Sequence, residues 1–160
     1  MTNSEFPGSE LTSALSEPVS VSWQSPSNIA FVKYWGKTGR QLPVNPSLSM
    51  TLSKAFTETT LTAFPRKIQG PVELDFWFES KQNQAFGERM AKFLNSVTDI
   101  FPWLVQVSLK LETRNTFPHS AGIASSASAF SALALCLCSL DTELIGIMLD
   151  ETEFRQKASY

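Results

Sequence analysis

The segment from residue 115 to residue 128 has the composition of an anion-binding loop. It reads Asn-Thr-Phe-Pro-His-Ser-Ala-Gly-Ile-Ala-Ser-Ser-Ala-Ser and connects a strand pattern to a long apolar helix pattern. Gly122 lets the backbone turn close to a ligand, and Ser125 and Ser126 add hydroxyls where a helix leaves its first N–H groups unpaired. The positive end of the helix dipole also attracts anions, so the loop favours phosphate. The small residues would equally let a buried helix pack closely, and this segment alone leaves both interpretations open.

Two features of the same loop exclude common alternatives. It lacks the Gly-Lys-Ser/Thr ending of a Walker A sequence, which disfavours a common P-loop nucleotide hydrolase. His119 is the only histidine of the chain, and a lone histidine in a loop is more often a local hydrogen-bonding residue than a catalytic base. We therefore assign His119 no catalytic role.

A second segment, residues 26–52, decides between the two interpretations. It contains Asn-Ile-Ala-Phe-Val-Lys-Tyr-Trp-Gly-Lys at 28–37 and Leu-Pro-Val-Asn-Pro-Ser-Leu-Ser at 42–49. Together with the small-residue loop, this segment resembles the GHMP kinase superfamily and, within it, the diphosphomevalonate decarboxylases. The Lys-Tyr-Trp-Gly-Lys run is the specific part, because many small-molecule kinases share the phosphate loop alone. The resemblance covers about residues 19–160.

The resemblance implies an activity. Enzymes of this family use ATP and Mg²⁺ to phosphorylate the tertiary hydroxyl of mevalonate 5-diphosphate, and then release phosphate and carbon dioxide to give isopentenyl diphosphate. Two highly charged phosphate chains must be held close together, mainly by positioning and electrostatic stabilisation. A related mevalonate or phosphomevalonate kinase, or a decarboxylase for the monophosphate, is the nearest alternative. A non-catalytic phosphate-binding fragment is the alternative from a different class.

The resemblance also assigns residues to roles. Lys33 and Asn28 are expected near the reacting carboxylate and hydroxyl, as the catalytic pair. The expected substrate-binding residues contact or shape the wall around the diphosphate, and they are Tyr34, Trp35, Gly36 and Lys37. The expected ATP-binding residues surround the phosphates, and they are Gly122, Ile123, Ala124, Ser125 and Ser126. No protein ligand to Mg²⁺ is assigned, because magnesium takes phosphate oxygens and usually keeps several waters.

The fold implied is α+β, a mixed sheet backed by helices, as in the ribosomal-protein-like N-terminal domain of GHMP kinases. Residues 1–18 are expected to be a disordered tail, and residues 19–160 are expected to form the N-terminal domain, with the C-terminal domain absent. The helix pattern at residues 151–160 has no terminal cap, which predicts a chain cut within a helix and a fragment that is inactive alone. A homodimer is implied for the full-length enzyme.

Periodicity predicts the elements that must position these motifs. Val19, Val21 and Trp23 indicate a strand that Pro26 ends, and further strand signals lie at 48–52 and 57–64. Alternation predicts two more strands, at 72–78 and 105–111. Helix spacing predicts helices at 84–97, at 124–140 and from about 152, and Asp141 is expected to cap a separate short helix.

Composition limits the partners and the compartment. Thirteen basic and fifteen acidic residues give a net charge of −2 without a basic block, which argues against nucleic acid and anionic membranes. Residues 1–18 carry no targeting signal, and the apolar stretch at 127–140 is too short to span a bilayer. Cys136 and Cys138 have neither disulfide nor CxxC spacing, so we expect buried structural thiols in a cytoplasmic protein.

Overall fold

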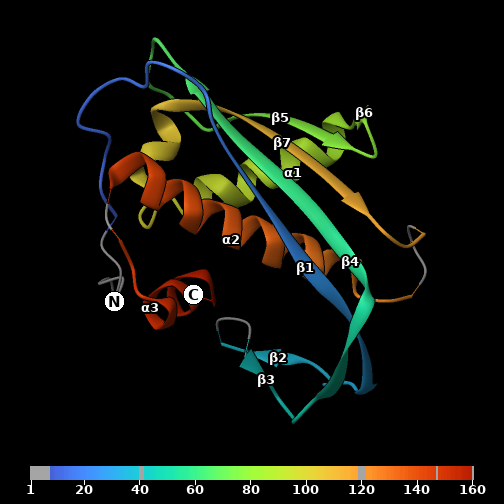
Figure 1. Ribbon diagram of the computed structural model, residues 1–160. Helices are drawn as coiled ribbons and strands as arrows, with labels where there is room; N and C mark the ends of the chain where they lie inside the picture. The colour runs from blue at the N-terminus through green and yellow to red at the C-terminus, as the bar shows by residue number, and fades with distance from the viewer. Residues whose placement is uncertain (1–7, 40–41, 119–121, 147, 160) are drawn as a thin grey trace.

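The computed structural model describes residues 8–39, 42–118, 122–146 and 148–159. Its main element is a five-stranded sheet in the order β1-β4-β7-β5-β6, seen in Figure 1. The strands are β1 (Val19–Val32), β4 (Leu48–Pro65), β5 (Glu73–Phe78), β6 (Lys81–Gln82) and β7 (Val107–Asn115). All neighbours pair antiparallel except β5 and β7, which pair parallel. The sheet is therefore mixed, as expected.

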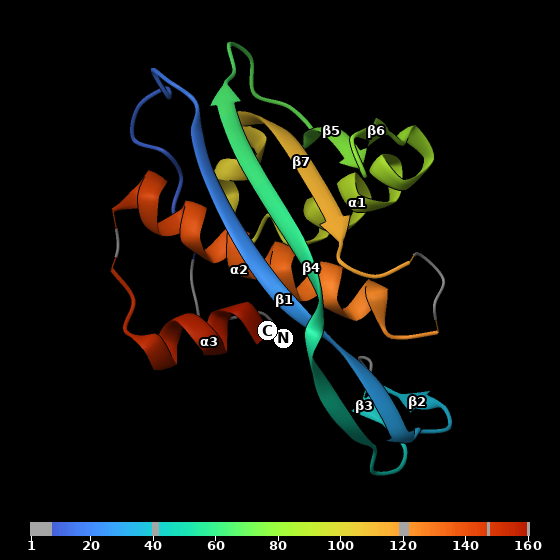
Figure 2. The same ribbon diagram turned by 45° about the vertical axis from the view of Figure 1, so that its right-hand side comes forward.

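Helices cover one face of this sheet. They are α1 (Gln84–Ser96), α2 (Ser125–Ile145), α3 (Glu151–Ser159) and the short 3-10 helix η1 (Pro102–Val105). Figures 1 and 2 both show α1 and α2 behind the sheet, with α2 crossing β1 and β4 and with α3 packed against α2. The arrangement confirms the α+β prediction.

Alternating side chains explain the two faces of the sheet. Leu61 and Ala63 of β4 and Leu109 and Leu111 of β7 point to the helices and are almost fully buried. The residues between them are polar and form hydroxyl pairs on the open face, such as Ser20–Thr62 and Ser22–Thr60. This is the pattern expected when only one face of an antiparallel sheet is covered. The predicted alternation is confirmed, except that Val105 lies in η1.

The sequence predicts that the first strand ends at Pro26, and this prediction was wrong. β1 continues to Val32, with a shift in its pairing with β4 between Pro26 and Asn28. A proline is tolerated here because β1 is the edge strand, where one row of N–H groups needs no partner. The two strand segments predicted at 48–52 and 57–64 are likewise one strand, β4.

The extra length of β1 and β4 builds a projection that we call the arm, residues 28–52. It carries the hairpin of β2 (Lys37–Thr38) and β3 (Leu42–Pro43), which lies beyond the rest of the sheet in Figures 1 and 2. The Lys-Tyr-Trp-Gly-Lys run therefore sits in a loop held by two long strands.

Asp141 does not cap a separate helix, which corrects a second expectation. α2 continues through it to Ile145 and ends at Gly146, whose φ is +76°. The carboxylate of Asp141 is buried, where it accepts hydrogen bonds from Lys157 Nζ at 2.8 Å and from Trp103 Nε1 at 2.8 Å. Lys157 is also buried, and its ammonium lies 5.0 Å from the centre of the Phe101 ring. This ion pair joins α2, α3 and η1.

The middle of α2 supplies part of the hydrophobic core of the domain. The sequence predicts that the apolar stretch at 127–140 is too short to span a bilayer. The helix has 21 residues and is long and apolar enough to cross one by length and composition, so that prediction was wrong. Its packing against β1 and β4 accounts for the apolar sequence instead. Cys136 and Cys138 are free and buried, and burial raises the pKa of each thiol to about 12. Both thiols stay protonated, as expected for structural cysteines.

Part of the N-terminal segment contacts the domain. Residues 1–7 lie outside the described residues, but Leu11 and Leu15 pack against the core. The backbone N–H of Leu11 donates to Gln106 Oε1 at 2.7 Å. Residues 8–18 contain no helix or strand, yet these contacts depart from the expected disordered tail.

We predict that Asp141→Ala lowers the free energy of unfolding by about 3–5 kcal/mol, because the Lys157 ammonium would remain buried without its partner. Glu151→Ala is the matched control, since it removes the exposed pair with Arg155 on α3 and should change stability by about 0.5 kcal/mol or less. Urea unfolding followed by circular dichroism measures both. Equal losses for the two variants would contradict the prediction.

A second prediction concerns Ser27, whose side chain on β1 is fully buried and has no hydrogen-bond partner among the described residues. A buried unpaired hydroxyl is unfavourable, so Ser27→Ala should raise the free energy of unfolding by about 1 kcal/mol. Ser128→Ala removes a buried hydroxyl that is hydrogen-bonded to Thr57 and should lower stability. A loss of stability in both variants, measured by urea unfolding, would show that Ser27 has a partner.

Candidate functional site

The first candidate region is the start of α2, where the phosphate loop was expected. Gly122 has a φ of +75°, a conformation that favours glycine, so the turn expected there is present. Ala124 is the N-cap residue, and an alanine side chain has no acceptor for the N–H groups of the first turn. Ser125 is half-buried and Ser126 is exposed. The Ser125 N–H donates to the Ile123 carbonyl at 2.6 Å, so the start of the helix offers the N–H groups of the following residues and two hydroxyls at its positive end.

One backbone contact joins this loop to the arm. The N–H of Ala124 donates to the carbonyl of Asn28 at 3.3 Å. Asn28 is half-buried in β1, opposite Thr51 of β4, at the point where the arm begins. Two motifs that lie about ninety residues apart in the sequence are thus neighbours, because β1 passes directly beside the end of the loop.

The Lys-Tyr-Trp-Gly-Lys loop is held by Asn45. Asn45 Oδ1 accepts from the backbone N–H of Trp35 at 2.7 Å, and Nδ2 donates to the carbonyl of Lys33 at 3.4 Å. Gly36, with a φ of +81°, turns the chain, and its carbonyl accepts from Val44 N–H at 3.3 Å. Asn45 had no role assigned from the sequence. Its place between Pro43 and Pro46, where an amide can satisfy backbone groups of a turn, was the available signal.

The side chains of this loop are open to solvent. Lys33 is exposed, Tyr34 is 42% exposed and Trp35 is 84% exposed. The ammonium of Lys37 lies 5.8 Å from the centre of the Tyr34 ring, so these two predicted diphosphate ligands are close together. A phenol hydroxyl and an ammonium in one place suit an anionic ligand.

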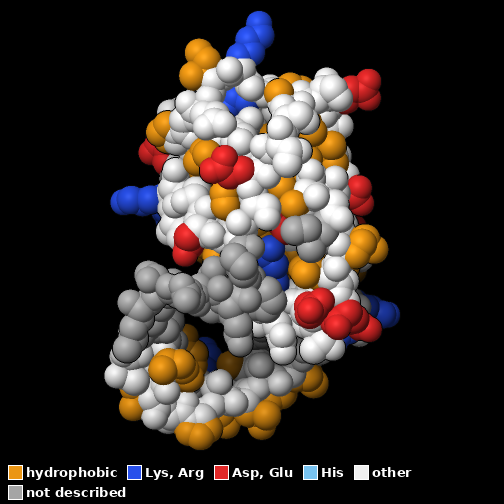
Figure 3. Space-filling model, turned by 90° about the vertical axis from the view of Figure 1, so that its left-hand side faces the viewer, with side chains coloured by type: hydrophobic (Ala, Val, Ile, Leu, Met, Phe, Trp, Pro, Cys, Tyr) orange, Lys and Arg blue, Asp and Glu red, His pale blue; other side chains and the backbone are white. Residues whose placement is uncertain are grey.

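Apolar side chains also gather on the arm. Figure 3 shows hydrophobic side chains over the lower end of the molecule, where the arm lies. The large exposed ones there are Ile29, Phe31, Val32, Trp35, Leu42, Val44, Leu48 and Met50. Exposed clusters of this kind mark contact surfaces, so the arm has the character of a binding element.

A cavity of about 390 Å³ adjoins the start of α2. Its lining includes Ser125 and Ser126 at the start of α2, together with Asn83, the N-cap residue of α1, and Arg89 in the second turn of α1. The remaining lining residues are Phe76, Phe78, Phe86, Thr113, Asn115 and Ala129. The cavity combines aromatic walls with a few polar groups, which is typical of a small-molecule site.

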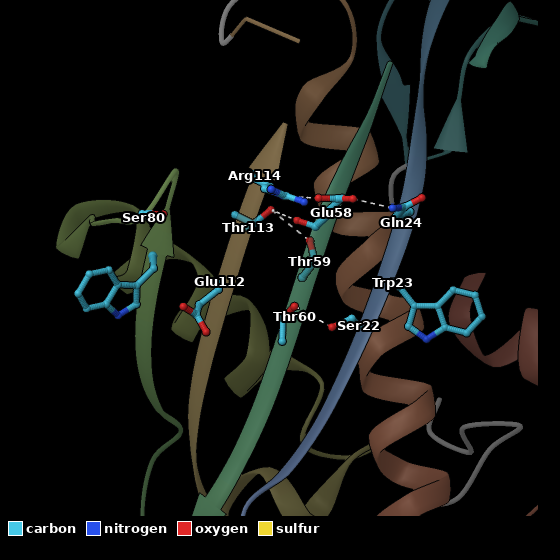
Figure 4. A pocket seen from close by; sticks show the side chains of 11 residues that line it. Ser22, Trp23, Gln24, Glu58, Thr59, Thr60, Ser80, Glu112, Thr113 and Arg114 are labelled. Carbon is cyan, nitrogen blue, oxygen red and sulfur yellow. Dashed lines mark hydrogen bonds and ion pairs between the residues drawn. The ribbon is translucent and has the colours of Figure 1, made fainter. Parts of the chain in front are cut away.

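A larger hollow of about 640 Å³ lies on the open face of the sheet and contains none of the predicted site residues. Figure 4 shows that Gln24, Glu58 and Arg114 form a row across three strands, with Ser22 and Thr60 beside it. Gln24 Nε2 donates to Glu58 Oε1 at 2.6 Å, and Arg114 forms an ion pair with the same carboxylate. These groups satisfy one another, so this surface is a weaker candidate for ligand binding.

Acidic side chains elsewhere on the domain have structural roles. Asp75 accepts from Trp77 Nε1 at 2.7 Å and from Gln82 Nε2 at 2.8 Å, and these hydrogen bonds hold its pKa below the usual value. Glu151 and Glu153 lie in the first turn of α3, where carboxylates favour the positive end of the helix dipole. His119 lies outside the described residues. No cluster of three or more potential metal-binding side chains (His, Cys, Asp or Glu) occurs in the described part of the chain.

Comparison with known proteins identifies the family and agrees with the fold. The family model for the diphosphomevalonate decarboxylase-like N-terminal domain matches residues 25–159. A diphosphomevalonate decarboxylase of Candida albicans is 35% identical over 132 residues, which cover 76% of this chain and 36% of that protein. The chain thus spans about a third of that relative's length.

Solved structures give the same result. Mevalonate diphosphate decarboxylase from Staphylococcus aureus superposes with a TM-score of 0.67 at 28% identity, covering 88% of this chain and 40% of that one. A structure described as MDDEF in complex with MVAPP, AMPPCP and magnesium gives a TM-score of 0.63 at 32% identity, covering 88% of this chain and 41% of that one. The family model, the relative and the folds agree, and this chain belongs to the family of diphosphomevalonate decarboxylase-like N-terminal domains.

Proposed function

We propose that this chain supplies the N-terminal domain of an ATP-dependent decarboxylase that converts mevalonate 5-diphosphate to isopentenyl diphosphate. The observation that carries the proposal is the hydrogen bond between Ala124 N–H and the Asn28 carbonyl. This contact joins the start of α2, our candidate anion site, to the base of the arm, which carries Tyr34 and Lys37. Transfer of a phosphoryl group between two phosphate-bearing molecules requires two such anion sites close together.

The start of α2 and the adjoining cavity are the proposed ATP site. Backbone N–H groups at Gly122, Ile123 and Ser126 would bind the phosphates, with the hydroxyls of Ser125 and Ser126 beside them. The Ala124 N–H holds the loop to the Asn28 carbonyl. The aromatic walls of the cavity suit a purine ring, and a ring placed there lies next to Ser125 and Ser126. Mg²⁺ would bind mainly phosphate oxygens and water, since the loop offers it hydroxyls but no carboxylate. A relative of the same fold was solved with AMPPCP and magnesium, which supports ATP and Mg²⁺ as the ligands.

The arm is the proposed site for the second substrate. Tyr34 and Lys37 would hold its diphosphate, with Trp35 and Gly36 shaping the wall. Asn28 and Lys33 would lie nearer the carboxylate and the tertiary hydroxyl, where an amide and a cation orient the substrate and offset developing charge. Bound MVAPP in the same relative supports a substrate of this class.

The chemistry follows from leaving-group strength. The tertiary hydroxyl takes the γ-phosphoryl group of ATP, because hydroxide is a poor leaving group and phosphate is a good one. Phosphate then departs with the C–O electron pair, and the electrons of the C–carboxylate bond form the new double bond as carbon dioxide leaves. The residues of this chain orient the reactants and balance their charge during both steps.

The direct test uses this chain within the full-length enzyme whose N-terminal domain we propose it to be. That enzyme is incubated with ATP, Mg²⁺ and carboxyl-labelled mevalonate 5-diphosphate, and ADP and labelled carbon dioxide are followed separately. Equal release of both is expected. ADP without carbon dioxide would indicate a kinase instead. If neither product forms and calorimetry still detects ATP binding, the chain is a phosphate-binding domain without its own activity.

Lys37→Ala should weaken binding of mevalonate 5-diphosphate by about tenfold to a hundredfold, because a charge-assisted contact contributes about 1.5–3 kcal/mol. The affinity for mevalonate 5-phosphate should fall less, so the variant discriminates less between the two ligands. Lys67→Ala removes an exposed lysine far from the arm and serves as the control. Isothermal titration calorimetry with both ligands measures the effect. Unchanged diphosphate affinity would remove Lys37 from the site.

Gly122→Ala should lower the affinity for ATP, because its φ of +75° strains any other residue and moves the loop. Gly146→Ala is a closely matched control, since its φ is +76° at the far end of α2 and a Cβ at either glycine meets no atom within 4 Å. Both variants should lose about 1–2 kcal/mol of stability, but only Gly122→Ala should weaken ATP binding in calorimetry. Equal ATP affinities would count against the loop as the phosphate site.

A further inference from the structure

A buried hydrogen-bonded chain connects β4 to the wall of the cavity beside α2. Its centre is Thr57, a β4 residue that is 1% exposed and was not singled out from the sequence as a site residue. Thr57 Oγ1 donates to Asn115 Oδ1 at 2.8 Å and lies 2.6 Å from Ser128 Oγ. Asn115 is the last residue of β7 and lines the cavity. Ser128 lies in the first turn of α2.

The direction of these hydrogen bonds follows from the proton count. A threonine hydroxyl has one proton and can accept further hydrogen bonds. Since Thr57 gives its proton to Asn115, the short contact with Ser128 must be a donation from Ser128 to Thr57. Ser128 Oγ also lies 3.0 Å from the carbonyl of Ser125, which gives its proton a second acceptor if Thr57 is removed.

This arrangement determines which atoms Asn115 can offer to a ligand. Its backbone is fixed, because its N–H donates to Glu79 Oε1 at 2.9 Å. Its side-chain oxygen is occupied by Thr57, so the two Nδ2 protons are the groups left for the cavity. Three phenylalanines line the cavity, and a phenyl ring carries no N–H or O–H group. An amide donor beside them would therefore favour a bound ring that has an acceptor atom.

We propose that Thr57 is a positioning residue that orients the Asn115 amide, with Nδ2 toward the cavity, for recognition of a heteroaromatic base with an acceptor nitrogen. The inference rests on the proposed ATP site, and it assigns recognition of the base to the Asn115 amide. Thr57 itself does not touch the ligand. Loss of the Thr57 hydroxyl frees the Asn115 amide to rotate. In part of the protein molecules the side-chain oxygen, and not the Nδ2 donor, then faces the cavity.

The first experiment compares Thr57→Val with Thr57→Ser by calorimetric titration of ATP and of inorganic tripolyphosphate. Thr57→Val keeps the shape and removes the hydroxyl, and we expect about a tenfold loss of ATP affinity, equivalent to about 1.4 kcal/mol. Tripolyphosphate has no base and should bind within twofold of the unmodified protein, because Ser128 retains the Ser125 carbonyl as acceptor. Thr57→Ser restores the hydroxyl and should restore ATP affinity.

Thr59→Val is the matched control. Thr59 is 2% exposed, lies on the same strand and pairs with Thr113 Oγ1 at 3.1 Å, so its loss should lower stability to a similar extent. Thr113 keeps its hydrogen bond to the Glu58 carbonyl and stays in place. ATP affinity should therefore remain within twofold. An equal loss of ATP and tripolyphosphate binding in Thr57→Val, or no loss of either, would overturn the inference.

A second measurement needs no nucleotide. In the free protein, nuclear Overhauser contacts should connect the Asn115 Nδ2 protons to aromatic protons of the cavity, and Thr57→Val should weaken them. Contacts from Nδ2 to the Thr57 methyl group instead would overturn the inference. If the unmodified protein binds neither ATP nor tripolyphosphate, the proposed ATP site fails, while this measurement still decides the role of Thr57.

Discussion

The seating of α2 against β1 and β4 is the constraint on which the rest of the structure depends. Leu133, Leu137 and Leu140 are almost fully buried in this contact, and burying side chains of this size contributes about 1.5–3 kcal/mol each. The same contact sets where the positive end of the helix lies. Because a helix is rigid, packing its middle against the sheet also places its first turn beside the Asn28 carbonyl. The packing that forms the core therefore also determines the geometry of the candidate site.

Polar contacts hold each end of this apolar helix. Near the C-terminal end, the Asp141 carboxylate binds Lys157 and Trp103 in a buried network, which attaches α3 and η1. At the N-terminal end, Ser128 contacts Thr57 on the strand beneath. Apolar packing alone tolerates small slides of a helix along a sheet, whereas a buried polar group that moves loses its partner. The two polar contacts thus make the position of α2 specific.

The arm depends on a different property of the chain. β1 and β4 extend past the other strands, and their far ends have few neighbours, so their apolar side chains remain exposed. The loop that they carry is ordered by local hydrogen bonds from Asn45 rather than by a core. A binding loop built this way presents large side chains to a ligand while its backbone stays fixed.

The sequence by itself determined the local elements and the two motifs. Alternation at 72–78 and helix spacing at 84–97 predicted β5 and α1, because those patterns arise from periodicities of the backbone itself. Residue types suited to an anionic ligand predicted the small-residue loop, whereas the roles of individual candidate residues came from the resemblance that this loop and the Lys-Tyr-Trp-Gly-Lys run carry.

Only the tertiary structure decided which distant residues meet. Pro26 did not end β1 because the strand lies at a sheet edge, and an edge position cannot be read from the strand itself. Asp141 proved to be an ion-pair partner rather than a cap because Lys157 approaches it from another helix. Thr57, Asn115 and Ser128 come from three separate elements, and each alone is an ordinary polar residue. Their contact arises from packing, which joins parts of the chain that local sequence patterns describe independently.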